Sequence, residues 1–121
     1  MKSILLIEDD PFLADIYNTK LKKAGFSIDI AVDGQEGLRK IKEQIPDLVL
    51  LDIVLPNVDG WEFLNRVRKD YRLSDLKIVI ISNLAQKGEI KKGLELGAVK
   101  YLIKAHYTPS EIVDVIKKIL K

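Results

Sequence analysis

Three short runs of consecutive apolar residues constrain the fold more than any other feature of this sequence. The runs ILLI, LVLL and IVII occupy residues 4–7, 48–51 and 78–81, and each is apolar at every position. A strand has apolar side chains in both directions when both faces of its sheet are covered, which is typical of parallel sheets. The three runs therefore predict the central strands of a parallel sheet.

Two further stretches predict the edges of the same sheet. Residues 27–31, SIDIA, alternate polar with apolar side chains, and residues 99–103, VKYLI, include Lys100. Strands with polar positions suit the exposed edges of a sheet. Because helical patterns separate all five stretches, we expect an α/β fold with a five-stranded parallel sheet in the order 2-1-3-4-5 and helices on both faces.

Local signals indicate how two of the helices are built. Asp10 predicts the N-cap of the first helix, and Ile16 is one of the apolar positions that we expect to face the core. The fourth helix, roughly residues 86–96, contains Gly88 and Gly93. Each glycine costs on the order of 1 kcal/mol relative to alanine, so we expect this helix to be the least stable.

Length and composition exclude several classes of function. The chain of 121 residues has the size of one domain, residues 1–121. Its net charge is only +2, with Lys and Arg spread among Asp and Glu, so we expect no direct binding to nucleic acid. The absence of cysteine excludes disulfides, thiolate zinc sites and cysteine nucleophiles. Apolar runs too short for a signal peptide or a membrane span predict no membrane insertion and a cytoplasmic location.

Polar side chains gather where the predicted strands end. They follow four of the five strands and are Glu8, Asp9, Asp10, Asp52, Ser82, Asn83 and Lys104. The carboxyl ends of parallel strands lie at one edge of a sheet, and the first and third strands are neighbours in the expected order. We therefore expect Asp9 and Asp52 to face each other.

Clustered carboxylates repel one another unless a cation or a basic side chain stands between them. With no histidine or cysteine nearby, carboxylates from two strands favour a hard cation, Mg²⁺ or Mn²⁺. A lysine and a hydroxyl beside such a site suit a transferred phosphoryl group, and an aspartate next to a metal can itself be the nucleophile. The pattern thus predicts phosphoryl chemistry at this edge of the sheet.

Four segments in this order resemble the receiver domains of two-component response regulators. They are LLIEDDP, VLLDIVLPNVDGWEFL, IVIISN and GAVKYLIK. The second has the spacing D-x-x-x-P-x-x-x-G at Asp52, Pro56 and Gly60, and the similarity covers essentially the whole chain. The resemblance implies a flavodoxin-like receiver fold and a phosphorylation-dependent signalling switch. Such a domain is not a metabolic enzyme, since it catalyses only its own phosphorylation and dephosphorylation.

The resemblance also implies roles for individual residues. Asp52 would be the phospho-acceptor, supplied by a histidine kinase or a phosphotransfer protein. Asp9, Asp52 and the backbone carbonyl of Val54 would hold Mg²⁺, and Glu8 would act through water. Lys104 would meet the phosphoryl group.

Further positions would transmit and limit the signal. Ser82 and Tyr101 stand at the switch positions of the family, and the surface of the fourth helix, fifth strand and fifth helix would change its affinity for a downstream protein target. Val54 and Leu84 would flank the path of the water that hydrolyses the phosphate, with Asn83 narrowing the entrance. We expect these three residues to modulate the lifetime of the phosphorylated form.

Two positions depart from the family pattern, and two other functions compete with it. Ala105 follows Lys104 where the family usually has proline in a cis peptide, and Asn83 stands where it usually has a smaller residue. A phosphohydrolase of the haloacid dehalogenase type would need a second aspartate where this chain has Val54. A nucleotide- or flavin-binding protein would need a Gly-rich or hydroxyl-rich loop after the first strand, where three carboxylates have the wrong charge.

Overall fold

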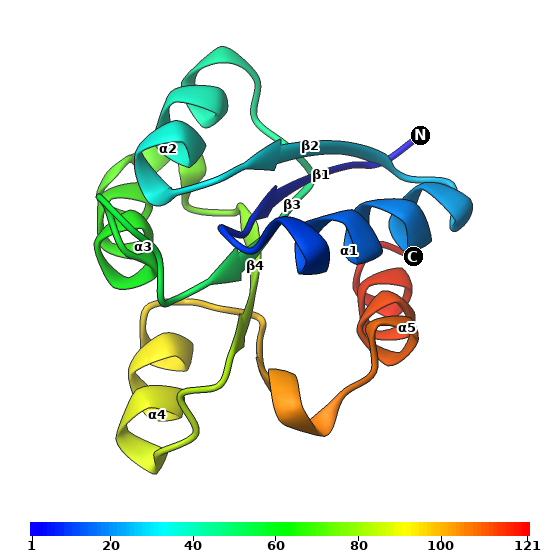
Figure 1. Cartoon of the computed structure of the whole chain (residues 1–121). Coiled ribbons are helices and arrows are strands. Elements are labelled where there is room, and N and C mark those ends of the chain that lie inside the picture. Colours follow the sequence, from blue (N-terminus) through cyan, green and yellow to red (C-terminus); the bar gives the residue numbers. More distant parts are fainter.

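The computed structural model describes residues 1–121 and contains five strands and five α-helices that alternate along the chain (Figure 1). The strands are β1 (Ser3–Ile7), β2 (Ser27–Ala31), β3 (Leu48–Asp52), β4 (Lys77–Ser82) and β5 (Lys100–Ile103). The helices are α1 (Pro11–Lys23), α2 (Gly34–Glu43), α3 (Gly60–Lys69), α4 (Lys87–Glu95) and α5 (Pro109–Ile119), with short 3₁₀ turns η1 (Tyr71–Leu73) and η2 (Lys104–His106). None of the helices is long and apolar enough to cross a membrane.

The strands form one parallel sheet in the order β2-β1-β3-β4-β5, which confirms the predicted topology. Helices α1 and α5 cover one face, and α2, α3 and α4 cover the other (Figure 1). The strand order changes direction between β1 and β3, where Ile7 lies opposite Leu51. In folds of this kind ligands bind beyond the carboxyl ends of the strands at such a point.

The sheet separates two apolar cores, as the fully apolar runs require. Leu5 and Ile7 belong to the core under α2 and α3, whereas Ile4 and Leu6 belong to the core under α1 and α5. Successive side chains of a strand point to opposite faces, so a strand that serves both cores is apolar throughout. All residues of β3 are buried, whereas β2 alternates exposed and half-buried positions before its last residue.

The first helix begins as predicted but uses a different face for packing. The Asp10 carboxylate accepts two backbone N–H groups of the first turn, at 2.9 and 3.3 Å. The prediction that Ile16 faces the core is wrong, because Ile16 is 42% exposed. Ala14, Tyr17 and Leu21 are buried instead, and their spacing of three and four residues defines the stripe that meets the sheet.

Candidate functional site

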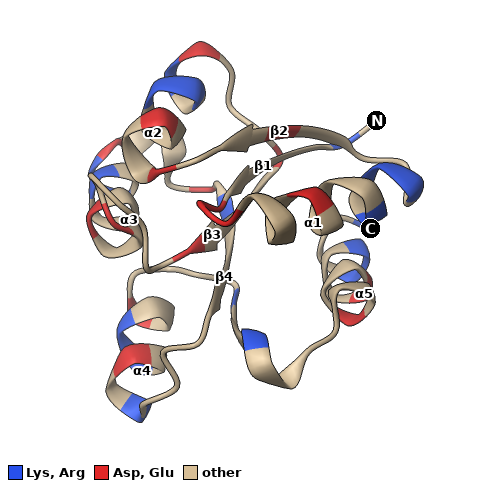
Figure 2. Ribbon diagram, in the orientation of Figure 1, with Lys and Arg blue, Asp and Glu red and all other residues tan.

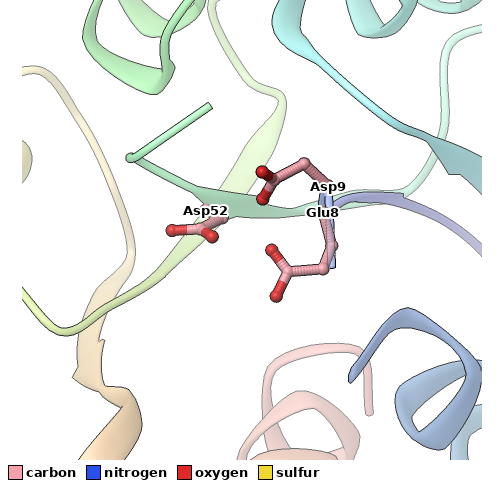
Figure 3. Close-up of side chains that lie close together, drawn as sticks. All are labelled: Glu8, Asp9 and Asp52. Atoms are coloured by element: carbon pink, nitrogen blue, oxygen red, sulfur yellow. The ribbon is translucent and has the colours of Figure 1, made fainter. Parts of the chain in front are cut away.

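Four predicted site residues meet at the carboxyl edge of the sheet. Glu8 and Asp9 follow β1 directly, Asp52 ends β3, and Lys104 follows β5. The three carboxylates converge on one space beside the ends of β1 and β3 (Figure 3), and one oxygen of each lies within 4.8 Å of the others. The prediction that Asp9 and Asp52 lie close together is confirmed.

Lys104 places a positive charge inside this acidic cluster. Its Nζ donates to Oε1 of Glu8 at 2.8 Å and to Oδ2 of Asp52 at 2.9 Å. The side chain of Glu8 is 0% exposed and that of Asp52 is 7% exposed, so both hydrogen bonds lie almost out of water. Breaking a buried pair by removing one partner costs about 3–5 kcal/mol, because the remaining charge is left uncompensated.

Burial controls the protonation of Glu8. Burial and the neighbouring Asp52 together raise the pKa of Glu8 to about 8, and Lys104 opposes the shift only in part. Burial lowers the pKa of Lys104, but its hydrogen bonds to Glu8 and Asp52 outweigh burial, so that the pKa of Lys104 is raised overall. The site therefore keeps its lysine charged and favours a proton on Glu8.

The acidic cluster has the chemistry of a divalent metal site. Figure 2 shows the acidic residues standing together at the ends of β1 and β3. Oxygen Oε2 of Glu8 is buried without a hydrogen-bond partner. A buried acceptor without a partner costs about 1–3 kcal/mol, which a proton or a nearby cation can offset. Three carboxylates around such an oxygen fit a hard cation of the Mg²⁺ type.

The two predicted switch residues are linked through the backbone of Leu84. Ser82 is fully buried at the end of β4, and its Oγ accepts the N–H of Leu84 at 3.1 Å. Tyr101, in β5, donates its hydroxyl to the carbonyl oxygen of Leu84 at 2.7 Å. The Tyr101 ring also lies against α4, where a Cβ at Gly93 would come within 2.9 Å of it. Sequence reasoning missed the linking role of Leu84, because backbone atoms perform it.

The loop between β3 and α3 is folded tightly against Asp52. The N–H of Gly60 donates to the carbonyl oxygen of Ile53 at 2.8 Å, and a Cβ at Gly60 would lie 2.6 Å from the carbonyl oxygen of Asp52. Only glycine allows α3 to begin so close to the strand end. The N–H of Val54 donates to Oδ1 of Asp52 at 3.3 Å, while residue Val54 is 62% exposed.

The remaining predicted positions border the site without entering the ion-pair network. Asn83 is exposed after β4, and Leu84 is half-buried and packs against the core under α2 and α3. Residues Lys104–His106 form the 3₁₀ turn η2, and the chain contains no cis peptide bond. Lys104 thus reaches both carboxylates with Ala105 in the position after it.

Comparison with known proteins gives a consistent result over nearly the full chain. A family model described as "Response regulator receiver domain" matches residues 4–117. The DNA-binding dual master transcriptional regulator RpaA of Synechocystis sp. is 38% identical over 104 residues, which are 86% of this chain and 43% of that protein. The chain therefore spans less than half the length of this curated relative.

Solved structures show the same fold. A CheY-like response regulator receiver domain protein of Methanospirillum hungatei has a TM-score of 0.90 at 30% sequence identity, covering 99% of this chain and 94% of that one. The BeF3-activated N-terminal receiver domain of Klebsiella pneumoniae RstA has a TM-score of 0.88 at 28% identity, covering 98% of each chain.

Proposed function

Because this chain belongs to the response regulator receiver domain family, we propose that Asp52 takes up a phosphoryl group and that the signal leaves through the surface of α4, β5 and α5. Receiver domains are phosphoacceptor modules of signalling and not classical enzymes. One observation supports Asp52 above all others. It is an almost buried carboxylate at a strand end, paired with Lys104 and next to two more carboxylates.

Receiver domains bind a divalent metal at an acidic pocket, and the cluster at Asp52 fits such an ion. In our proposal Mg²⁺ is held by Asp9, Asp52 and the backbone carbonyl of Val54, and Glu8 acts through water. Mn²⁺ has the same preference for oxygen ligands and would occupy the same place. When bound, the cation would neutralise negative charge on the phosphoryl oxygens.

The phosphoryl group comes from a phosphohistidine of a histidine kinase or of a phosphotransfer protein. A carboxylate oxygen of Asp52 forms a bond to phosphorus while the bond from phosphorus to the imidazole nitrogen breaks, and the nitrogen keeps the electron pair. The ammonium group of Lys104 has three N–H donors, which stabilise the oxygens of the group in transfer.

The phosphoryl group then draws donors toward Asp52. It adds about −1.5 to −2 charges and three acceptor oxygens, and Ser82, at the end of the neighbouring strand β4, offers a hydroxyl donor. When Ser82 turns, the N–H of Leu84 loses its acceptor and the hydrogen bond from Tyr101 to Leu84 shifts with it. The change reaches α4 because the Tyr101 ring packs on Gly93.

The partner that receives the signal is, in our proposal, a protein. RpaA is described as a DNA-binding transcriptional regulator, but this chain covers less than half of it, and its net charge of +2 is small for a domain that binds nucleic acid. The alternative of a phosphohydrolase of the haloacid dehalogenase type is not supported. The family match is to receiver domains, and Val54 stands where the second aspartate would be.

Labelling with acetyl phosphate tests the proposal. We expect the wild-type protein to incorporate phosphate only with Mg²⁺, and Asp52→Asn to incorporate none. Asp59→Asn is the matched control: Asp59 is exposed and caps α3, and asparagine retains the cap. Incorporation by Asp52→Asn at the wild-type rate would show that another residue is the acceptor.

A further inference from the structure

One side-chain pair joins two loops beside the acidic site. Asn57, in the loop between β3 and α3, donates from Nδ2 to Oδ2 of Asp33 at the start of α2, at 2.7 Å. The backbones of these loops meet as well, because the N–H of Gly34 donates to the carbonyl oxygen of Val58 at 3.0 Å. A side chain at Gly34 would collide with that carbonyl group, so the close approach of the two loops requires glycine.

Asn57 has an unusual backbone conformation. Its φ angle is +62°, and it is the one non-glycine residue of the chain with positive φ. Asparagine tolerates the left-handed region better than most residues, but the conformation still has to be held by its surroundings. The hydrogen bond to Asp33 is the side-chain contact that holds it.

The segment held in this way is the one that contains Val54. The loop runs from Val54 through Asn57 to Gly60, and its base is closed by the hydrogen bond between Gly60 and Ile53. Val54 is mostly exposed and is held by its N–H bond to Asp52, while the adjacent Leu55 is buried in the core under α2 and α3. Beyond Leu55, the segment is held by the contacts of Asn57 and Val58 with the start of α2, and Asn57 provides the side-chain contact of the two.

We propose that Asn57 is a positioning residue for metal binding, which through Asp33 holds the β3–α3 loop in the conformation that offers the Val54 carbonyl as a ligand. The inference rests on the proposed function, because it assumes a divalent metal at the acidic cluster. Residues that orient the direct ligands of a metal typically change its affinity by about 10- to 100-fold when they are removed.

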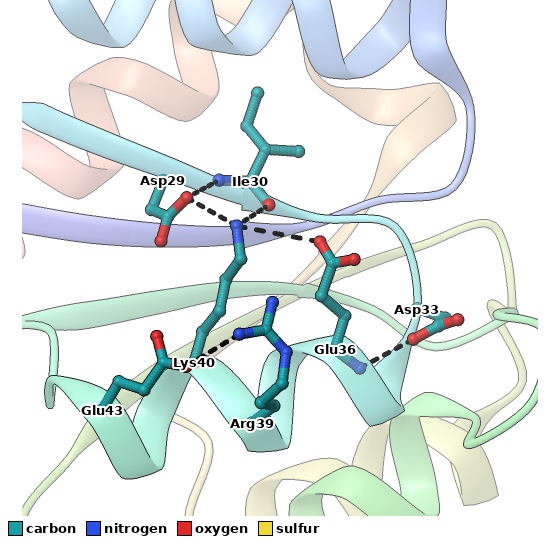
Figure 4. A network of polar contacts seen from close by, with 7 residues as sticks. All are labelled: Asp29, Ile30, Asp33, Glu36, Arg39, Lys40 and Glu43. Atoms are coloured by element: carbon teal, nitrogen blue, oxygen red, sulfur yellow. Dashed lines mark hydrogen bonds and ion pairs between the residues drawn. The ribbon is translucent and has the colours of Figure 1, made fainter.

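The two carboxylate oxygens of Asp33 accept different hydrogen bonds, so the contact with Asn57 can be removed without removing the cap of α2. Oδ1 accepts the N–H of Glu36 at 2.8 Å and caps α2 (Figure 4). Oδ2 accepts from Nδ2 of Asn57. The hydrogen bonds from Glu36 and from Asn57 both lower the pKa of Asp33. Nearby, Lys40 pairs with Asp29 and Glu36 and does not involve Asp33. Serine at position 33 would retain a capping oxygen and lose the bond to Asn57.

The experiment compares Mg²⁺ affinity with stability in four variants of the full chain. Asn57→Gly keeps the positive φ, removes the amide and changes no charge, so it is the decisive variant. Asp33→Ser and the double variant complete a thermodynamic cycle. Asp47→Ser is the matched control, because Asp47 also joins two segments, through Ser3 at 2.7 Å, but at the amino edge of the sheet. Calorimetric Mg²⁺ titration gives the affinity, and urea unfolding gives the stability.

We expect Asn57→Gly and Asp33→Ser each to weaken Mg²⁺ binding about tenfold, and the double variant to bind no more weakly than either single variant. Asp47→Ser should lose stability and bind Mg²⁺ as the wild type does. Wild-type affinity in Asn57→Gly, or equal weakening in Asp47→Ser, would overturn the inference and leave the proposed function intact. A wild-type protein that binds no Mg²⁺ would overturn both.

Discussion

Alanine substitutions at the two glycines of α4 should change the stability of the protein in opposite directions. Gly88 and Gly93 lie in the same helix, but a Cβ at Gly88 would meet no atom within 4 Å. A Cβ at Gly93 would lie 2.8 Å from Cδ1 of Ile80 and 2.9 Å from Cδ2 of Tyr101. The pair thus separates helix propensity, which both substitutions improve, from packing, which only Gly93→Ala disturbs.

The size of the difference follows from these contacts. Alanine favours a helix over glycine by about 0.8–1.0 kcal/mol, so Gly88→Ala should raise the free energy of unfolding by about 1 kcal/mol. Gly93→Ala has the same gain, but inserting an atom into a packed site costs about 1–3 kcal/mol. The Tyr101 ring cannot withdraw freely, because its hydroxyl is bonded to Leu84. The two variants should therefore differ by about 1–3 kcal/mol in favour of Gly88→Ala.

Urea unfolding followed by far-ultraviolet circular dichroism measures this difference. We expect the urea concentration at the midpoint of unfolding to rise for Gly88→Ala and to fall below that of the wild type for Gly93→Ala. The slope of the free energy of unfolding against urea concentration should be the same in both variants. If Gly93→Ala unfolds at the same urea concentration as Gly88→Ala, the Tyr101 ring does not restrict α4, and the reasoning is refuted.

Four other properties can be measured on the same protein. Folding raises the pKa of Glu8 from 4.5 to about 8, so the stability contributed by its protonated form is complete below about pH 4.5 and is lost as the pH rises through 8. Because Mg²⁺ displaces this proton, the affinity of the protein for Mg²⁺ should increase between about pH 6 and pH 8, by at most about tenfold per pH unit. Calorimetric titrations that give the same Mg²⁺ affinity across this range would contradict the prediction. Val54→Asn combined with Leu84→Glu should shorten the lifetime of the phosphorylated form, because polar side chains orient the attacking water; equal rates of phosphate release at fixed Mg²⁺ would argue against shielding. Helix α4, with two glycines and no side-chain cap, should show the fastest amide exchange of the five helices, and uniform protection would count against that expectation.

The sheet and its strand order were predictable because they depend on side chains alone. The fully apolar runs require cover on both faces, and the polar positions of residues 27–31 and 99–103 suit only edges. The limits of the strands were less predictable, since polar residues such as Lys77 and Ser82 continue the backbone pairing of β4. Ile16 was misplaced because the helical pattern allows two neighbouring stripes, and contact with the sheet selects the one with Ala14.

The acidic site was predictable to the extent that topology determines it. Parallel strands bring Asp9 and Asp52 to one edge whatever their side-chain conformations are. The two hydrogen bonds of Lys104 were harder to predict from the sequence, because they depend on how the turn η2 directs a long side chain. The link through Leu84 and the contact of Asn57 depend on backbone geometry, including one positive φ angle, which residue types alone do not determine.

The most direct test of the account is to locate the phosphoryl group. An acyl phosphate on an aspartate is reduced by borohydride to a homoserine residue, which mass spectrometry can assign to one position after proteolysis. After treatment with acetyl phosphate and Mg²⁺, we predict homoserine at position 52 and at no other aspartate. Homoserine at the position of Asp9 or Asp10 with Asp52 unchanged would contradict the central claim that Asp52 is the phospho-acceptor.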